Sequence, residues 1–506
     1  MKNNSKRHIN HRIILIIFLF HLIFPVFGQQ NSEKIIIGEH TIFHSEIFNE
    51  DWRLTIHLPK NYNVDKINYP VVYHLYGNNI YNYFSPAVNV LENLNSDGLM
   101  PAAILIGIAN NDRYRDNLPL QNNGSPGGAS RFLEFFKKEL IPFIDENFNT
   151  NDYRMIIGPQ AGSVFGLYTL MEDPEVFNAY ILNNSFYNPV SGKYLINRIQ
   201  KEFNKETVLN NFLYFKYESG NIRGLDMVER FKNHMDNNAP QGLNFIIVKK
   251  EAEGDFIEMM DIKRAFKTMF SEYKPPENFQ VNDLNDLKDY YKKYSEKIGM
   301  EVDIPDQTLY MAGNKLVSRQ LYDKAIELFK YQLKVYPEST NALFFLAETL
   351  RTTGELESAV QYYKRFLNLM NEDVSFVFAR MEQTEKIIKS SASYAIEKII
   401  RESGIIAGAK KFKQLKLEKD SDLYFDQREI NLLGYKYLNM SKITEAIEIF
   451  KMNVILFPES ANVYDSIAEA YMKQGDKKAA IKNYRKVIEL DAENKNAKDM
   501  LIKLKK

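Results

Sequence analysis

The C-terminal half of this chain repeats a helical unit, and this repeat restricts the fold more than any other feature of the sequence. The segments YDKAIELFKYQLKVYPES (322–339) and ITEAIEIFKMNVILFPES (443–460) follow one pattern. Windows of 34 residues share that pattern at 306–339, 340–373, 427–460 and 461–494. A fixed period of this length indicates stacked copies of one supersecondary unit, each of which buries its apolar face against its neighbours.

Each window has a small residue in its first helix and an aromatic residue in its second helix. The small residues are Gly313, Ala347, Gly434 and Ala468, and the aromatic residues are Phe329, Tyr363, Phe450 and Tyr484. A small side chain lets two helices approach closely, and the aromatic ring fills the remaining space. The pattern resembles the tetratricopeptide repeat and implies an all-α solenoid over residues 305–506. Within it, we expect degenerate helices at 374–426 and a polar capping helix at 495–506.

Residues 29–275 show a different pattern, in which strand-like and helical segments alternate. The strand-like runs are 52–58, 71–76, 102–109, 154–158, 179–185, 212–217 and 243–250. The later runs are almost continuously apolar, which is typical of strands buried on both faces of a parallel sheet. With helical spacing between them, they predict an α/β domain with a mainly parallel sheet flanked by helices. The polar segment 276–304 is expected to be a linker.

The first 28 residues have the features of a secretory signal peptide. Basic residues up to Arg12 precede an apolar run from Ile13 to Phe27, and Gly28 is a small residue at the expected cleavage point. The run is shorter than the roughly 20 residues of a membrane-spanning helix, which favours cleavage over an uncleaved anchor. The sequence therefore predicts a secreted or periplasmic protein with no stable membrane span after cleavage.

Charge and composition exclude several classes of function. The chain of 506 residues has 65 basic and 65 acidic side chains, so its overall charge gives no reason to expect nucleic acid as a partner. It has no cysteine, which excludes disulfides, thiol catalysis and cysteine-based metal sites. No histidine and carboxylate spacing suggests a metal site, and no dinucleotide or phosphate-loop motif is present. We expect neither a metal nor a cofactor.

The segment IIGPQAGS (156–163) predicts a strand, a tight turn and a helix. Gly158 and Gly162 have the spacing of the nucleophile elbow G-x-S-x-G, in which the central serine attacks the substrate. The residue between the two glycines is Gln160 instead of serine. The segment therefore predicts the turn of a hydrolase without its usual nucleophile.

Blocks around this turn resemble an esterase family of α/β-hydrolases that includes esterase-D-like and siderophore-ester hydrolases. The blocks include YPVVYHLYGNNIY (69–81), ILIGIANNDRYRDNLP (104–119) and FGLYTLMEDPEVFNAYILNNSFY (165–187). The resemblance covers nearly all of 38–273 and implies an α/β-hydrolase fold with a serine, histidine and acid triad.

The resemblance places the nucleophile at Gln160, the base near Gly254 or Asp255, and the acid near Ile222. A primary amide is not a nucleophile of this kind. The last histidine of the chain is His234, so no histidine follows the last strand. We therefore expect that the domain has lost its triad and is a pseudo-esterase.

Two alternatives remain open for this site. The first is an active carboxylic-ester or siderophore-ester hydrolase with a rearranged nucleophile such as Ser163, although Ser163 is expected to pack inside the first turn of the helix. The second is a degenerate pocket that binds a small ester-like ligand without reacting. Its expected lining is Gly77, Asn78, Arg113, Gln160 and Ala161.

Three more expectations concern neighbouring residues and the repeats. Arg113 and Arg115 either add charge to the pocket or, as we favour, form a structural ion-pair network with Asp112 and Asp116. His74, in the strand before the pocket loop, is expected to be a core histidine. The repeat array is expected to bind a protein or peptide on its concave face; alternatively it only packs on the hydrolase domain or mediates self-association.

Overall fold

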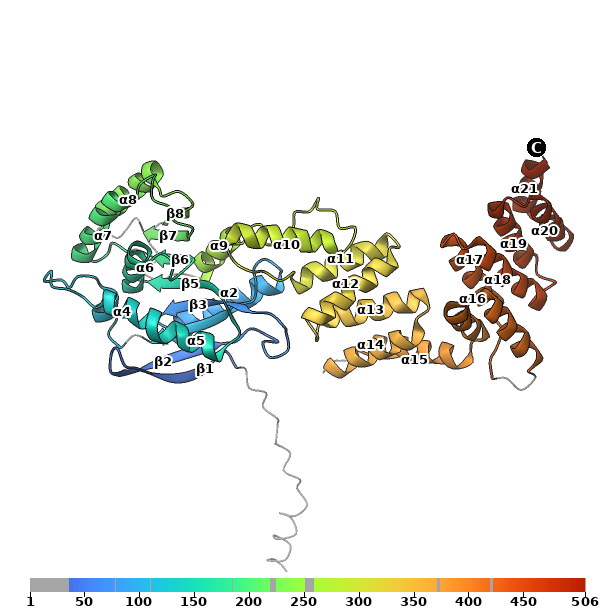
Figure 1. Cartoon of the computed structure of the whole chain (residues 1–506), viewed down its shortest axis with the longest axis horizontal. Coiled ribbons are helices and arrows are strands. Elements are labelled where there is room, and N and C mark those ends of the chain that lie inside the picture. Colours follow the sequence, from blue (N-terminus) through green and yellow to red (C-terminus); the bar gives the residue numbers. More distant parts are fainter. Residues whose placement is uncertain are drawn as a thin grey trace, which may run out of the picture.

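The computed structural model describes residues 36–77, 79–109, 111–183, 185–218, 224–250, 259–370, 374–418 and 422–505. Within them, a sheet domain lies at one end and a helical array extends from it to the C-terminus (Figure 1). Several predictions lie outside these residues: the signal peptide with its cleavage at Gly28, the pocket residue Asn78, the acid position near Ile222, and the base position at Gly254 or Asp255.

The described residues of the sheet domain form one sheet of eight strands. These are β1 (Glu39–Ser45), β2 (Glu50–His57), β3 (Tyr69–Leu75), β4 (Ile104–Ala109), β5 (Thr150–Pro159), β6 (Ala179–Asn183), β7 (Phe212–Glu218) and β8 (Asn244–Lys250). Their order is β1-β2-β4-β3-β5-β6-β7-β8. The pairs β1–β2 and β2–β4 are antiparallel, and all other pairs are parallel. This confirms the predicted mainly parallel sheet and its predicted strands.

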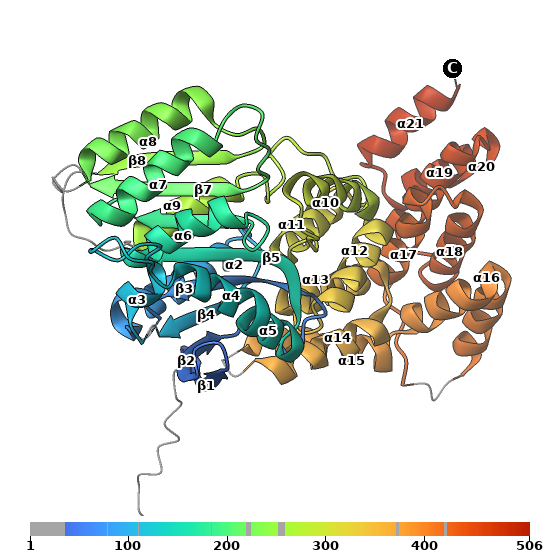
Figure 2. The same cartoon turned by 60° about the vertical axis from the view of Figure 1, so that its left-hand side comes forward.

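Helices cover both faces of the sheet (Figure 2). One face packs against α2 (Ser85–Ser96) and α9 (Met259–Met269). The other packs against α4 (Ala129–Phe135), α5 (Ile141–Asn147), α6 (Ala161–Glu172), α7 (Pro189–Glu202) and α8 (Leu225–Asn238). Short helix α3 (Arg113–Asn117) follows β4, and two π-helical turns, η1 (Ile80–Phe84) and η2 (Phe136–Leu140), complete the domain. Every residue of β3 is buried, as expected for a central strand covered on both sides.

The array consists of paired helices that follow the predicted windows. The pairs are α11 (Asp306–Ser318) and α12 (Tyr322–Val335), α13 (Thr340–Thr353) and α14 (Leu356–Leu369), α15 (Ser375–Ser390) and α16 (Ala392–Leu417), α17 (Gln427–Asn439) and α18 (Ile443–Leu456), and α19 (Ala461–Gln474) and α20 (Lys477–Leu490), followed by α21 (Lys495–Lys505). A Cβ on Gly313 would lie 2.3 Å from the ring of Phe329, and one on Gly434 would lie 2.3 Å from the ring of Phe450. The small residue therefore faces the aromatic residue in these two repeats, as predicted.

The segment 276–304, predicted as a linker, contains a helix that the sequence analysis did not predict. This helix, α10 (Leu284–Ile298), buries one apolar face made of Leu284, Leu287, Tyr291 and Tyr294. Its spacing is that of an amphipathic helix, but the many charged residues between these positions hid the pattern. The segment is therefore a structured part of the junction between the two halves of the chain.

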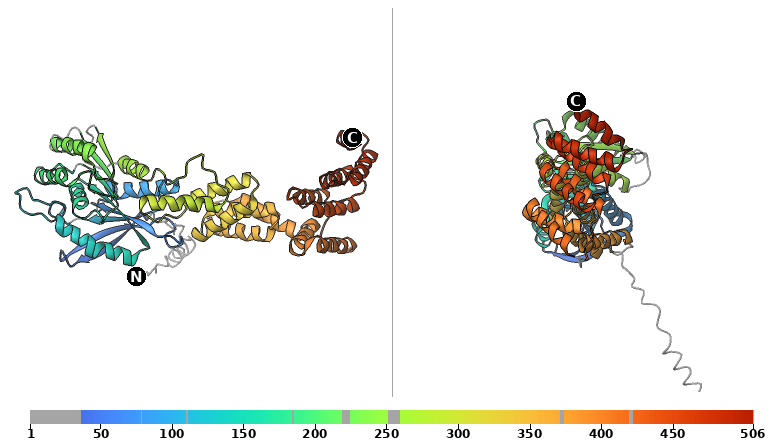
Figure 3. Two further views of the ribbon diagram at one scale, coloured as in Figure 1. Left: turned by 45° about the horizontal axis from the view of Figure 1, so that its top comes forward. Right: turned by 90° about the vertical axis from the view of Figure 1, so that its right-hand side faces the viewer.

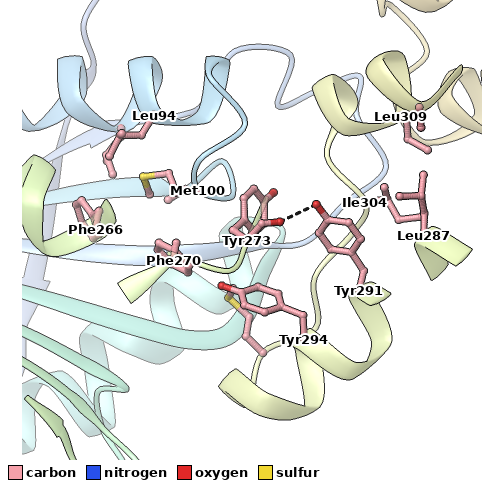
Figure 4. Packing of buried hydrophobic residues seen from close by; sticks show 14 of the residues in the cluster. Leu94, Met100, Phe266, Phe270, Tyr273, Leu287, Tyr291, Tyr294, Ile304 and Leu309 are labelled. Atoms are coloured by element: carbon pink, nitrogen blue, oxygen red, sulfur yellow. Dashed lines mark hydrogen bonds between the residues drawn. The ribbon is translucent and has the colours of Figure 1, made fainter. Parts of the chain in front are cut away.

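Helix α10 joins the sheet domain and the first repeats into one hydrophobic core (Figure 4). The residues in the figure come from the sheet domain (Leu94, Met100, Phe266, Phe270, Tyr273), from α10 (Leu287, Tyr291, Tyr294) and from the start of the array (Ile304, Leu309). The hydroxyl of Tyr291 donates a hydrogen bond to the carbonyl oxygen of Tyr273 at 2.7 Å. The first repeats therefore pack on the sheet domain.

The later repeats are built around separate cores. Residues of α16 to α19 form one cluster, and residues of α19 to α21 form another. Figure 3 shows these helices at the end of the molecule farthest from the sheet. The array is thus anchored at its first repeats, and its later repeats do not share the core of the sheet domain.

The shared core predicts a large effect of truncating a side chain at its centre. Phe270 is 2% exposed, and we expect Phe270→Ala to lower the free energy of unfolding by about 3–5 kcal/mol. The matched control is Phe376→Ala on α15, where the ring is 58% exposed and the change should stay below about 1 kcal/mol. Chemical denaturation followed by circular dichroism measures both. Equal effects of the two substitutions would contradict a core shared by the two halves.

Candidate functional site at the β5–α6 turn

The predicted elbow is present between β5 and α6. Strand β5 ends at Pro159, helix α6 begins at Ala161, and Gln160 connects them with φ 50° and ψ −118°. A non-glycine residue in such a conformation is strained by about 1–3 kcal/mol, and strain of this kind is typical of functional turns. In α/β-hydrolases this sharp turn exposes the nucleophile at the top of the sheet. Here the turn holds Gln160 in that place.

Two glycines make the tight turn sterically feasible. A Cβ on Gly158 would lie 2.4 Å from the carbonyl oxygen of Gly162. A Cβ on Gly162 would lie 2.8 Å from Cδ1 of Leu75 on β3. Any larger side chain at either position would push α6 away from the sheet. The close approach of helix and strand therefore explains why the elbow keeps both glycines.

Ser163 lies within the first turn of α6 and is completely buried. Its hydroxyl and that of Ser185 are 2.5 Å apart, and Ser185 Oγ also donates to the backbone carbonyl of Ser163 at 2.8 Å. This pairing satisfies the serine inside the domain. The arrangement is the packing role that the sequence analysis favoured for Ser163.

The histidines of the described residues are all bonded to groups outside the turn. His40 contacts Thr55, His44 contacts Asp51, His57 contacts Glu92 and the carbonyl of Ile37, His74 contacts the carbonyl of Leu75, and His234 contacts the carbonyl of Phe203. His74 is fully buried, and its burial lowers its pKa to about 4. It is therefore a neutral core histidine at physiological pH, as expected.

Two tyrosines that the sequence analysis missed lie beside the turn. Tyr76 follows β3 and is 5% exposed, and its hydroxyl lies beside the backbone N–H of Gly162 without a hydrogen bond of good geometry among the described residues. Burial raises its pKa, while the charge of Arg113 and the backbone N–H of Gly162 oppose the rise. Tyr187 follows β6. Burial raises its pKa, Tyr76 and Tyr114 add to the rise, and the charge of Arg113 opposes it. Both tyrosines follow the carboxyl ends of parallel strands, where α/β folds form their binding sites. This position after a predicted strand is the feature of the sequence that could have identified them.

The two arginines of the DRYRD block have different roles. Arg115 pairs with Asp116 at 2.6 Å and with Glu50 at 2.7 Å, as the favoured structural network predicted. Asp112 is not part of that network, because its carboxylate caps α3 by accepting from the N–H groups of Tyr114 and Arg115. Arg113 differs from the prediction as well. Its guanidinium lies over the rings of Tyr76 and Tyr114, at 5.5 and 5.1 Å, so it brings positive charge to the turn.

The predicted pocket residues are brought together only in part. Ala161 begins α6, so its N–H is one of the first N–H groups of the helix and points toward the turn. Gly77 packs against β4, where a Cβ would lie 2.2 Å from the Cα of Gly107, and its N–H donates to the carbonyl of Ile108 at 3.0 Å. Gly77 therefore serves packing between strands. Arg113, Tyr76 and Tyr187 instead lie near one another, with Tyr76 beside Gly162 at the start of α6.

Among the residues that the structure covers, no group of three or more histidine and carboxylate side chains is placed to hold a metal ion. Within the same ranges, no helix combines the length and the apolar character that crossing a bilayer demands.

The fold and this turn define a domain of the α/β-hydrolase class. Residues 45–237 match the model of the family described as "Putative esterase". Residues 310–369 and 461–494 match models described as "Tetratricopeptide repeat". The chain thus carries an esterase-family domain followed by tetratricopeptide repeats, and such repeats give it a capacity for protein interaction.

Curated relatives match only parts of the chain. An uncharacterized protein YbbA from Bacillus subtilis is 26% identical over 135 residues, which is 25% of this chain and 53% of YbbA. The TPR repeat-containing protein MJ1428 from Methanocaldococcus jannaschii is 24% identical over 211 residues, 41% of this chain and 35% of that protein. The chain thus spans about half of the first relative and about a third of the second.

Solved structures with a similar fold include an IroE-like serine hydrolase from Shewanella oneidensis, with 23% identity, a TM-score of 0.48, and coverage of 59% of this chain and 99% of the other. An uncharacterised protein from Capnocytophaga ochracea has 20% identity, a TM-score of 0.45, and coverage of 69% and 99%. Siderophore hydrolase EstB from Aspergillus nidulans has 17% identity, a TM-score of 0.41, and coverage of 49% and 100%.

The strained turn predicts a reversal of the usual order of stability between alanine and glycine. At an ordinary position glycine is less stable than alanine by roughly 0.5–1 kcal/mol. At residue 160, with φ 50° and ψ −118°, we expect Gln160→Gly to be more stable than Gln160→Ala by about 1 kcal/mol, because only glycine adopts this conformation without strain. Urea denaturation of the two variants measures the difference. A Gln160→Gly protein less stable than Gln160→Ala would show that the turn is relaxed.

Proposed function

We propose that the N-terminal domain is a secreted pseudo-esterase, which binds a small ester-like or anionic ligand without hydrolysing it, and that the repeat array binds a protein or peptide. The N-terminal apolar segment supports export to a secreted or periplasmic location. The match to tetratricopeptide repeats supports the interaction role of the array.

The observation that carries the proposal is Gln160 in the strained turn between β5 and α6. An amide has no hydroxyl or thiol from which a base can create a nucleophile. The histidines of the described residues are bonded elsewhere, and no histidine follows His234 in the sequence. Hydrolysis through a covalent acyl-enzyme needs both a nucleophile and a base. The loss of both removes this mechanism, whereas a single substitution would leave one of the two groups in place.

The surroundings of Gln160 favour binding over decay of the site. The positive end of α6, the Arg113 guanidinium and the hydroxyl of Tyr76 offer donors at one place. Such a set suits a carbonyl or carboxylate oxygen. These are the groups that an ester and its acid product present, so these donors fit the binding half of ester recognition.

The second candidate function is hydrolysis by a rearranged site with Ser163 as nucleophile. Against it stand the complete burial of Ser163 and its pairing with Ser185. A nucleophile must reach its substrate and a base within hydrogen-bond distance. For Ser163 to act, α6 would have to open at its first turn, where Gly162 packs on Leu75.

An ester assay with a matched series of variants tests the proposal. We expect protein lacking residues 1–28 to show no turnover of short-chain nitrophenyl esters above buffer and no labelling by a fluorophosphonate. We also expect Gln160→Ser to remain inactive, because a serine without a base is only weakly nucleophilic. Turnover or labelling of the unsubstituted protein that Ser163→Ala abolishes would overturn the proposal in favour of the rearranged hydrolase.

A further inference from the structure

A cavity lies between the sheet domain and the first repeats. It is at the edge of the sheet where the parallel strands begin, whereas the β5–α6 turn is at the edge where they end. Its volume is about 640 Å³, which lies within the range of small-molecule sites. The loop between β2 and β3, the end of α2, the segment 300–307 and the segment 336–341 form its walls. We call it the junction cavity, because both halves of the chain contribute to it.

The walls of the junction cavity are strongly acidic. They contain one lysine, Lys60, and six carboxylate residues: Asp65, Glu92, Glu301, Asp303, Asp306 and Glu338. Glu92 already has a partner in His57, at 2.9 Å. The other five acids come from both halves of the chain and meet at the junction. Docking of the two halves therefore brings like charges together.

Three of these acids are partly buried, and none of the three forms a salt bridge within the described ranges. Burial raises the pKa of Asp65 to about 7, and the neighbouring charges that add to this rise are Asp306 and Glu338. Burial raises the pKa of Asp303 to about 6, with a further contribution from Glu301. Burial also raises the pKa of Asp306, against hydrogen bonds from Gln332 and Ser339. All the charges that act on Asp65 and Asp303 are thus negative.

Buried acceptors without partners accompany the carboxylates. Oδ1 of Asp65 is buried and has no hydrogen-bond partner among the described residues. Gln332 is completely buried, and its amide nitrogen donates to Asp306 Oδ1 at 2.8 Å and to Ser339 Oγ at 3.2 Å, both on the cavity wall. Its amide oxygen has no partner within the described ranges. Gln332 lies behind the wall, so the unpaired acceptor that lines the cavity is Asp65 Oδ1. A buried acceptor without a donor costs free energy, so this position favours a ligand that supplies an N–H group.

The spacing of the acids narrows the class of ligand. No group of three acids or histidines in the described residues is close enough to surround one metal ion. The acids instead come from separate segments of the wall: Asp65 from the loop between β2 and β3, Asp303 and Asp306 from the segment 300–307, and Glu338 from the segment 336–341. A ligand with two or more ammonium groups on a flexible chain fits that distribution, because each group can pair with a different carboxylate.

We propose that the junction cavity binds a small organic polycation of the diamine or polyamine class, held by Asp65, Asp303 and Asp306. Binding there neutralises the repulsion between the sheet domain and the array, and it stabilises their docked arrangement. The inference rests on the cavity and its acids, and it is independent of the chemistry at Gln160.

The pKa shifts give the pH dependence of both the free and the bound protein. The pKa of each of these carboxyl groups is higher in the folded protein than in the unfolded chain. At a pH between those two values, the folded protein therefore binds more protons than the unfolded chain. Without ligand, the stability of the junction therefore rises as the pH falls from about 8 through the folded pKa values of about 7 and 6. An ammonium ligand needs the ionised carboxylates, so its affinity rises in the opposite direction, from pH 5 to pH 8.

Thermal denaturation with spermidine as the probe tests the proposal on protein lacking residues 1–28. We expect spermidine at saturating concentration to raise the midpoint by about 2–4 °C at pH 8 and by much less at pH 5. Putrescine should act more weakly than spermidine, because it has fewer ammonium groups. Sodium chloride and magnesium chloride at matched ionic strength should not reproduce the shift. An equal shift with either salt would show simple screening and would overturn the proposal.

Two substitutions with a matched control locate the effect. We expect Asp65→Asn and Asp303→Asn each to weaken spermidine binding at least about tenfold in isothermal titration calorimetry at pH 8. Each should also raise the midpoint of the free protein at pH 8, because it removes a poorly solvated charge. Asp289→Asn, at an exposed position of α10, should leave both measurements unchanged. Unchanged spermidine affinity in Asp65→Asn and Asp303→Asn would refute the assignment.

Discussion

The close approach of α6 to the sheet is the contact on which the candidate site depends. A Cβ on Gly158 would lie 2.4 Å from the carbonyl oxygen of Gly162, so β5 can turn directly into α6 only because both residues are glycine. This contact forces residue 160 into its strained conformation and aims the N-terminus of α6 at the carboxyl edge of the sheet. Tyr76 and Arg113 then pack beside the start of α6, whose position the backbone of the turn determines.

The second organising contact is the hydrophobic core that the sheet domain shares with the first repeats through α10. Apolar burial there is large enough to hold the two halves together although their polar ends carry like charges. The acids of the junction cavity are a consequence of that docking: Asp65 belongs to the sheet domain, and Asp303 and Asp306 precede or begin the array. Burial in the docked arrangement raises the pKa values of Asp65 and Asp303, and neighbouring carboxylates add to the rise.

The sequence predicted what depends on local spacing and missed what depends on three-dimensional neighbours. The strands, the repeat helices and the glycines of the turn have periodic or motif signals, and they are present in the structure. Helix α10 was missed because its apolar positions are few and its other residues are highly charged. The different roles of Arg113 and Arg115 depend on Glu50, which is 65 positions away from Arg115 in the chain. The junction cavity could likewise not be predicted from the sequence, because Asp65 and Asp306 come close together only when the two halves of the chain dock.

The architecture of the turn and the chemistry of the residue at its centre are separable. The two glycines determine the turn through their contacts with the backbone and with Leu75, and the side chain of Gln160 does not cap α6. The turn therefore does not require a serine at residue 160. Family membership follows from the architecture, over residues 45–237, whereas a reaction follows only from the side chains placed on it. Here the turn keeps its strained conformation, and it places an amide where hydrolases of this fold place their nucleophile.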